Sequence, residues 1–117
     1  TLPMGADPKV GGENDGFRPL ELILVGLAGC TAMDVISILA KKRQRVTAFE
    51  VKAHGEQAES HPREFTSFTL EYIVTGSSLD PEAVARAVAL SQEKYCPVSA
   101  TLKKAGPVEA KITIREG

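Results

Sequence analysis

Tryptophan is absent from this chain, and its other aromatic residues are only four phenylalanines and two tyrosines. A binding groove lined with aromatic rings is therefore not expected. Acidic and basic residues nearly cancel, with a formal net charge of −1, so nucleic acid and anionic membranes are not expected partners. At 117 residues, with 43% hydrophobic and 25% charged residues, the chain has the composition of a single globular domain over 1–117.

A secretion signal and a membrane span are also missing from the expected features. Thr1–Gly5 has neither a basic start nor an apolar core. The most apolar run, Leu22–Met33, falls short of the ~20 residues that cross a bilayer, and it predicts a buried helix. We therefore expect a cytoplasmic protein whose two cysteines stay reduced. Because Thr1 is not an initiator methionine, we expect a fragment whose N-terminal strand region is truncated.

The order of predicted elements is helix, hairpin, helix, strand, which indicates the α+β class. Alternation with a period of two predicts the hairpin strands, and Asp80-Pro81 predicts a helix start. The expected elements are a loop with a short edge strand over 1–19, a helix over 20–43, strands over 46–54 and 65–75, a helix over 81–95, a short helix ending at 104, and a strand over 108–114.

The first of these helices is apolar on almost every side over 20–30. A helix that is apolar all round needs covering all round, and one small hairpin does not supply enough surface. This predicts an obligate dimer in which a second subunit covers part of the helix.

Two cysteines are the candidate reactive groups. Cys96 lies between two helical segments with Pro97 at the first helical position, where a helix N-terminus favours a thiolate. A small buried hydrophobe fits the same position. Cys30 lies in mid-helix, where burial raises the pKa of a thiol, and Asp34 would raise it further if it faces the same way. Gly29 beside it suggests that a partner helix or a ligand approaches the backbone there.

Two runs of sequence resemble one known family. Residues 18–34, RPLELILVGLAGCTAMD, resemble the central helix of OsmC/Ohr proteins, which carries their first catalytic cysteine. Residues 93–99, EKYCPVS, resemble the site of their second cysteine. The resemblance covers about residues 11 to 115 and is closest to the OsmC-like branch of the family.

The resemblance implies an OsmC-like fold: an intertwined homodimer with an antiparallel sheet and a long buried central helix. It also implies a thiol peroxidase in which Cys30 attacks an organic hydroperoxide and becomes a sulfenic acid. Cys96 then forms a disulfide with Cys30, and a dithiol reductant opens it. No metal or organic cofactor is implied. The alternative is the same dimer acting as an apolar-ligand-binding or redox-sensing module.

The activating charges of the family match this sequence less closely. Family peroxidases use an arginine from an N-terminal strand and a glutamate at the helix start, directly after a proline. Only Arg18 precedes the helix, at a position that does not match. Leu20 follows the proline, so the candidate glutamate is Glu21, about 100° further round the helix. Three other arginines could replace the family's activating arginine or could be solvated surface charges: Arg43, Arg45 and Arg63.

Histidines offer one further arrangement. His54 and His61 could complete a Cys2His2 metal site with the two cysteines, but the spacing resembles no zinc module. We therefore expect no metal.

Overall fold

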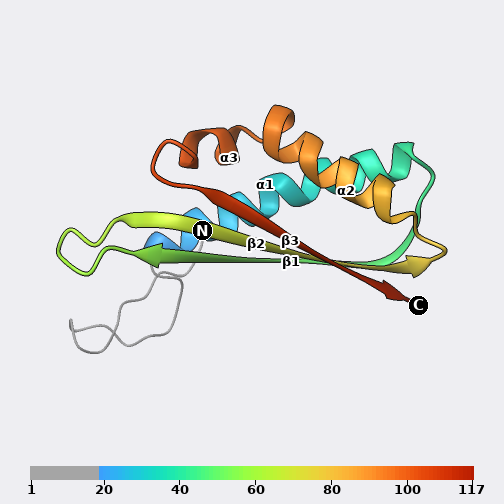
Figure 1. Ribbon diagram of the computed structural model, residues 1–117, viewed down its shortest axis with the longest axis horizontal. Coiled ribbons are helices and arrows are strands. Elements are labelled where there is room, and N and C mark those ends of the chain that lie inside the picture. The colour runs from blue at the N-terminus through green and yellow to red at the C-terminus, as the bar shows by residue number, and fades with distance from the viewer. Residues whose placement is uncertain (1–18) are drawn as a thin grey trace.

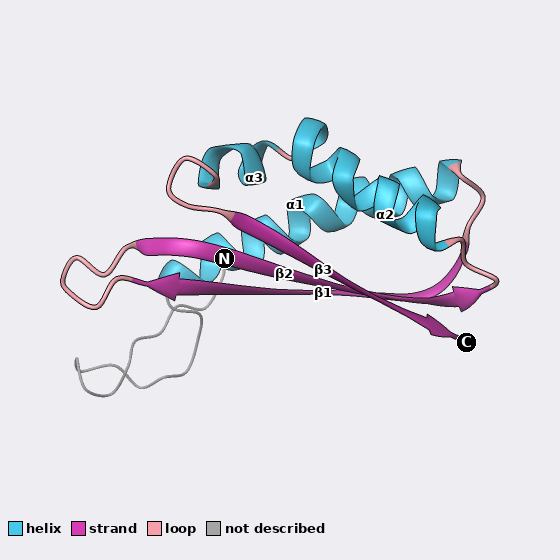
Figure 2. Cartoon of the chain, viewed as in Figure 1, coloured by secondary structure: helices cyan, strands magenta, loops and turns pink. Residues whose placement is uncertain are grey.

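Over residues 19–117 the fold consists of a three-stranded sheet and three α-helices (Figure 1). The computed structural model describes residues 19–117, so the expected edge strand and Arg18 lie outside the described residues. The α+β class is confirmed. Figure 2 shows the elements, which are α1 (Pro19–Lys41), β1 (Arg45–Gln57), β2 (Phe65–Ser77), α2 (Pro81–Leu90), the π-helical turn η2 (Ser91–Tyr95), α3 (Pro97–Leu102) and β3 (Val108–Glu116).

The sheet is mixed, which corrects the expectation of an antiparallel sheet. β1 and β2 form the expected antiparallel hairpin, with Phe49 opposite Val74. β3 instead pairs with β2 in parallel, with Phe68 opposite Val108. The reason is the connection: α2, η2 and α3 carry the chain from the end of β2 back to its beginning, so β3 runs in the same direction. A parallel neighbour requires such a crossover.

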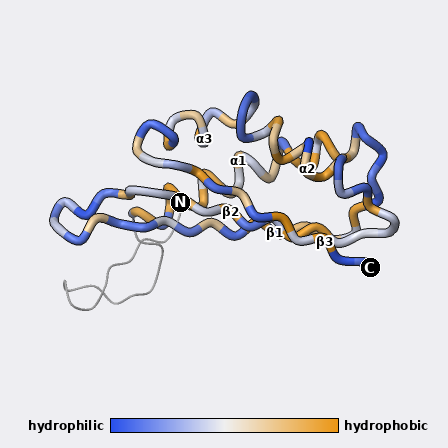
Figure 3. The backbone as a smooth tube through the Cα atoms, viewed as in Figure 1, coloured by the Kyte–Doolittle hydropathy of each residue, from blue (hydrophilic) through white to orange (hydrophobic). Residues whose placement is uncertain are grey.

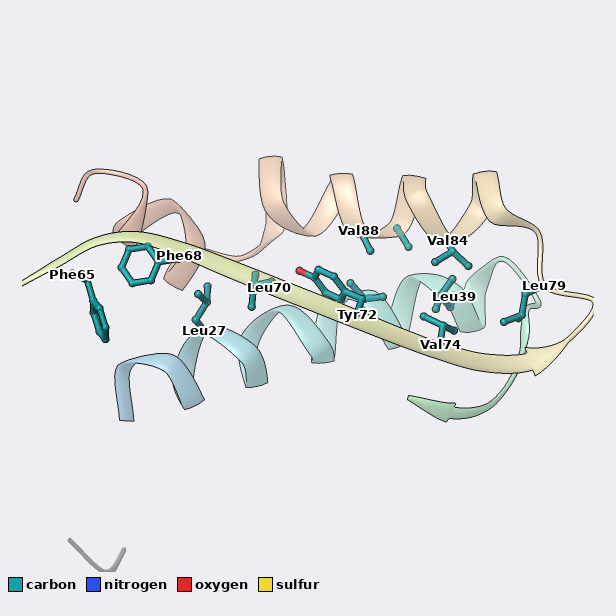
Figure 4. Packing of buried hydrophobic residues seen from close by; sticks show 12 residues of the cluster. Leu27, Leu39, Phe65, Phe68, Leu70, Tyr72, Val74, Leu79, Val84 and Val88 are labelled. Atoms are coloured by element: carbon teal, nitrogen blue, oxygen red, sulfur yellow. The ribbon is translucent and has the colours of Figure 1, made fainter. Parts of the chain in front are cut away.

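The apolar core lies between β2 and the helices (Figure 4). Successive side chains of a strand point to opposite faces, and β2 turns every second residue toward α1 and α2. The hydrophilic turn between β1 and β2 lies away from this core (Figure 3). The fully buried members of the core are Leu27, Val35 and Leu39 of α1, Phe68, Leu70, Tyr72 and Val74 of β2, and Val84 and Ala87 of α2.

One face of α1 is buried and the other is exposed. Thr31 and the buried apolar residues of α1 recur every fourth position and contact the sheet and the α2–α3 layer. On the other face Val25 is 49% exposed and Met33 is 77% exposed, and open space surrounds Gly29. The expected burial on every side is therefore not reached by the residues that the structure describes. By length and composition alone α1 could also span a membrane, as core helices of globular domains often could.

Candidate functional site

The two cysteines meet at the contact of α1 with the α2–α3 layer. Cys30 is half-buried in the middle of α1, and Cys96 is 3% exposed at the N-cap of α3. The two sulfurs and a carboxylate oxygen of Asp34 all lie within 4.8 Å of one another. Both cysteines are free thiols. Residues that are 66 positions apart in the sequence thus form one cluster, as the pairing of the two predicted site cysteines requires.

The π-helical turn sets the position of Cys96. The backbone N–H of Cys96 donates to the carbonyl of Ser91, five residues earlier, at 2.8 Å. The chain then becomes extended at Cys96 and enters α3 with Pro97 at its first position, as expected. The backbone N–H of Ser99 donates to Cys96 Sγ at 3.3 Å, so the Cys96 side chain caps the N-terminus of α3.

The electrostatic expectation for Cys96 is wrong in direction. Burial raises the pKa of the Cys96 thiol from 9.0 to about 11, and the hydrogen bond from Ser99 opposes this shift without overcoming it. The neighbouring Cys30 raises the pKa of Cys96 further. Cys96 is therefore a neutral thiol at pH 7, because removal of its surroundings from water outweighs the helix-end contacts.

A buried polar network adjoins the thiols, and few local sequence patterns indicate it. The hydroxyl of Thr31 shares hydrogen bonds with the Tyr72 hydroxyl at 2.7 Å and with the Ser91 hydroxyl at 2.8 Å. The amide of Gln92 donates to the Tyr72 hydroxyl at 2.6 Å and accepts from the Ser99 hydroxyl at 2.6 Å. Among the described residues no buried side-chain polar atom is left without a partner. The network therefore joins α1, β2, η2 and α3 around the two sulfurs.

Asp34 connects this network to the thiols. Ser91 Oγ donates to Asp34 Oδ2 at 3.2 Å. Asp34 follows Cys30 by four residues, so both side chains lie on the same side of α1. The sequence signals were the polar Thr31 and Asp34 inside an apolar helix, and Ser91 on the buried face of the next one.

A cavity opens beside Asp34. Its volume is about 370 Å³, and it lies between α1 and the end of the α2–η2 segment. Asp34 belongs both to its wall and to the group that it forms with the two sulfurs, so the cavity adjoins that group on its Asp34 side. The lining residues are Asp34, Ser37, Ile38 and Lys41 of α1, with Leu90 and Tyr95.

Glu21 lies far from the thiols of its own chain. It is exposed in the first turn of α1 and lines a shallow depression with Val51 and Ala53 of β1. Nine residues separate Glu21 from Cys30, which is about 14 Å along a helix axis. The structure therefore brings together two of the three expected site residues, Cys30 and Cys96.

The three arginines that could replace the family's activating arginine also lie away from the thiols. Arg43 and Arg45 line a polar pocket with Ser77 and Ser78 at the C-terminal end of α1, and Arg63 lies exposed in the β1–β2 turn. Within residues 19–117 no lysine or arginine forms an ion pair with Asp34.

The histidines do not join the cysteines. His54 Nε2 lies 2.8 Å from Glu56 Oε1 on the exposed side of β1, and His61 lies in the turn. In the described part of the chain the residue that completes a group of metal-ligating side chains with Cys30 and Cys96 is Asp34.

Comparisons with known proteins agree with this architecture. The family model described as "OsmC-like protein" matches residues 12–111. Protein YhfA of Escherichia coli K12 is 53% identical over 87 residues, which are 74% of this chain and 65% of YhfA, so the match spans less than two-thirds of that relative.

Solved structures show the same fold. The crystal structure of a hypothetical protein from Aquifex aeolicus VF5 is 33% identical, with a TM-score of 0.83 over 91% of this chain and 79% of that one. An organic hydroperoxide resistance protein OsmC from Legionella pneumophila is 18% identical, with a TM-score of 0.74 over 96% of this chain and 80% of that one. The family match over residues 12–111 and the shared fold lead to one conclusion: the chain belongs to the OsmC-like protein family.

Proposed function

We propose that this protein is a thiol peroxidase that reduces organic hydroperoxides, with Cys30 as the attacking thiol and Cys96 as the resolving thiol. The observation that supports this most is the approach of the two free sulfurs to within 4.8 Å. Membership of a family whose fold is shared by an organic hydroperoxide resistance protein supports the same chemistry.

The order of the two thiols follows from their surroundings. Cys30 is half-buried, four residues before Asp34 of the cavity wall, whereas Cys96 is 3% exposed and its pKa is raised to about 11. A peroxide therefore reaches Cys30 more easily than Cys96. Cys96 needs to meet only a sulfur that is already next to it.

The reaction balances in three steps. The Cys30 thiolate attacks the terminal oxygen of ROOH, the O–O bond breaks, and the leaving alkoxide takes a proton to become ROH. Cys30 is now a sulfenic acid. The Cys96 sulfur attacks the Cys30 sulfur, water leaves, and a disulfide forms. An external dithiol then reduces the disulfide by thiol–disulfide exchange.

The working unit in this proposal is a homodimer. Val25, Gly29, Met33 and Ile36 form the exposed face of α1, which we call the apolar face. The adjoining Cys30 and Asp34 lie at the border between this face and the buried one. A second copy packed on the apolar face would bury it and shield the thiols from bulk water. Glu21 remains a candidate for holding a cation in that assembly.

The expected compartment is the cytoplasm, because a two-thiol cycle needs a reducing environment to restore it. Neither nucleic acid nor a membrane is a proposed partner. Although α1 is apolar enough to span a bilayer, its buried face carries Thr31, which hydrogen-bonds to β2 and η2.

A second candidate is a redox-sensing or apolar-ligand-binding module with little turnover. One observation favours it: within residues 19–117 no lysine or arginine forms an ion pair with Asp34 beside the thiols. Without a nearby cation a thiolate is poorly stabilised, and oxidation by peroxide is slow.

Stopped-flow measurement of thiol loss separates the two candidates. Reduced, metal-free protein is mixed with cumene hydroperoxide or with hydrogen peroxide. The peroxidase predicts rapid loss of two thiols per chain, faster with the organic peroxide. Cys30→Ser should abolish peroxide consumption, whereas the matched Cys96→Ser should retain one fast oxidation without turnover. Thiols that survive for minutes in the wild type would reject the peroxidase and favour the sensing module.

A further inference from the structure

Cys30 Sγ, Cys96 Sγ and an oxygen of Asp34, the thiol cluster, have the spacing of a metal-ion ligand set. All three atoms lie within 4.8 Å of one another. Around a tetrahedral zinc ion, with Zn–S near 2.3 Å and Zn–O near 2.1 Å, two sulfurs and an oxygen lie about 3.6–3.8 Å apart. Side-chain adjustments of about 1 Å therefore bring the cluster around one ion.

The ligands come from a helix and a hydrogen-bonded helix end. Cys30 and Asp34 lie four residues apart on α1, the spacing at which two side chains of a helix meet. Cys96 is held by the turn between η2 and α3. Since these elements are packed by the polar network around Thr31, the geometry does not depend on a mobile loop.

Two of the three ligands, Asp34 and Cys96, accept a hydrogen bond from a neighbouring residue. Ser91 Oγ donates to Asp34 Oδ2 at 3.2 Å, and Ser99 N–H donates to Cys96 Sγ at 3.3 Å. Such outer partners orient metal ligands and stabilise their charged forms. In the described chain they compensate part of the negative charge on the cluster, where no lysine or arginine forms an ion pair with Asp34. A divalent cation would supply the missing positive charge.

We propose that the reduced protein binds one zinc ion per chain through Cys30, Asp34 and Cys96, with the fourth position open to a water molecule. Zinc suits two thiolates and a carboxylate, and three protein ligands with an open position are typical of its reactive sites. Each thiol releases one proton to solvent when zinc binds. Because the same two sulfurs form the disulfide in the proposed function, zinc and the disulfide exclude each other.

This site does not depend on peroxidase activity. It needs only the reduced thiols, so zinc binding and slow oxidation by peroxide are compatible results. If both are found, zinc is a cap that protects the thiols until the metal leaves.

The test is a titration of the reduced, metal-free full chain with Zn²⁺ against a chromophoric chelator, and with Co²⁺ followed by absorption. We expect one ion per chain, a thiolate-to-cobalt charge-transfer band and no binding by the disulfide form. Ser91→Ala removes the hydrogen-bond donor to Asp34 and should lower zinc affinity about 10–100-fold. Asp34→Asn removes a ligand and should lower the affinity more. His54→Ala is the matched control for a surface site, because His54 and Glu56 lie 2.8 Å apart.

Several results would overturn the proposal. They are unchanged affinity in Cys30→Ser or Asp34→Asn, zinc that is lost in His54→Ala, half an ion per chain, or no binding by protein whose thiols are shown to be reduced. The disulfide form needs no substitution, so the comparison of reduced and oxidised wild type stays informative even if a variant fails to fold.

Discussion

Cys30 Sγ lies within 4.8 Å of Cys96 Sγ, although one residue is in the middle of α1 and the other caps α3. A disulfide requires sulfurs at about 2.05 Å, so its formation needs a small movement of side chains rather than a change of fold. The two thiols are thus already arranged for intrachain chemistry in the reduced protein.

Gln92 is expected to control how readily the Cys30–Cys96 disulfide forms. Its amide bonds to the Tyr72 and Ser99 hydroxyls, and Ser99 in turn holds the Cys96 sulfur through its N–H. Gln92→Leu removes these bonds and should lower the free energy of unfolding by about 1–3 kcal/mol. Disulfide formation should slow more than the first oxidation of Cys30, measured as the two phases of thiol loss.

Glu93→Gln is the matched control for this substitution, because Glu93 is exposed in the same π-helical turn. Both phases should keep their wild-type rates in Glu93→Gln. Equal slowing of both phases in Gln92→Leu would argue against a positioning role for Gln92.

Alkaline pH should destabilise the fold. Burial raises the pKa of Cys96 from 9.0 to about 11, and burial also raises the pKa of Tyr72 above 10.0. A group whose pKa is raised by folding stabilises the fold below its unfolded pKa, and this contribution disappears as pH rises through the folded value. The free energy of unfolding of the metal-free protein, from urea titrations, should therefore fall between pH 9 and about 11.

Two tyrosine-to-phenylalanine substitutions show how much of the alkaline loss of stability comes from Tyr72. Tyr72→Phe removes a buried phenol and should reduce the alkaline loss of stability. Tyr95→Phe alters a phenol whose side chain is 50% exposed and should leave the loss unchanged. A free energy of unfolding that stays constant from pH 9 to 11 would contradict the raised pKa values.

The apolar face of α1 should hold the dimer together. Met33 is 77% exposed in one chain, so Met33→Glu leaves the fold of that chain intact while placing a charge in the proposed contact. Light scattering at micromolar concentration should report a dimer for the wild type and a monomer for Met33→Glu. Ala85→Glu, on the exposed side of α2, should remain dimeric. A monomeric wild type would remove the dimer from the account.

Local patterns in the sequence were sufficient for most of the elements. The apolar run, the alternation in the hairpin and Pro97 after Cys96 predicted α1, β1, β2 and the cap of α3 within a few residues. These features depend on neighbours in the chain. The parallel pairing of β3 was not predicted, because it depends on the path of the whole α2–η2–α3 connection.

The environment of the site was harder to predict than its two cysteines. Thr31 and Tyr72 are 41 residues apart in the sequence, and their contact follows from the packing of α1 on β2. The pKa of Cys96 depends on burial by several elements, which outweighs the local effect of the helix end. Its position four residues after Cys30 marks Asp34 only as a perturbing charge, whereas packing makes it a member of the thiol cluster.

The most direct test of the peroxidase account maps the bond that forms after one equivalent of cumene hydroperoxide. Equal amounts of ¹⁵N-labelled and unlabelled chains are unfolded together, refolded so that mixed dimers form, oxidised, digested and analysed by mass spectrometry. The account predicts a Cys30–Cys96 disulfide joining peptides of one isotopic kind, and a sulfenic acid on Cys30 in Cys96→Ser. Oxidation of Cys96 while Cys30 stays a thiol would contradict it. So would disulfides of which about half join a labelled to an unlabelled peptide, because such bonds link different chains.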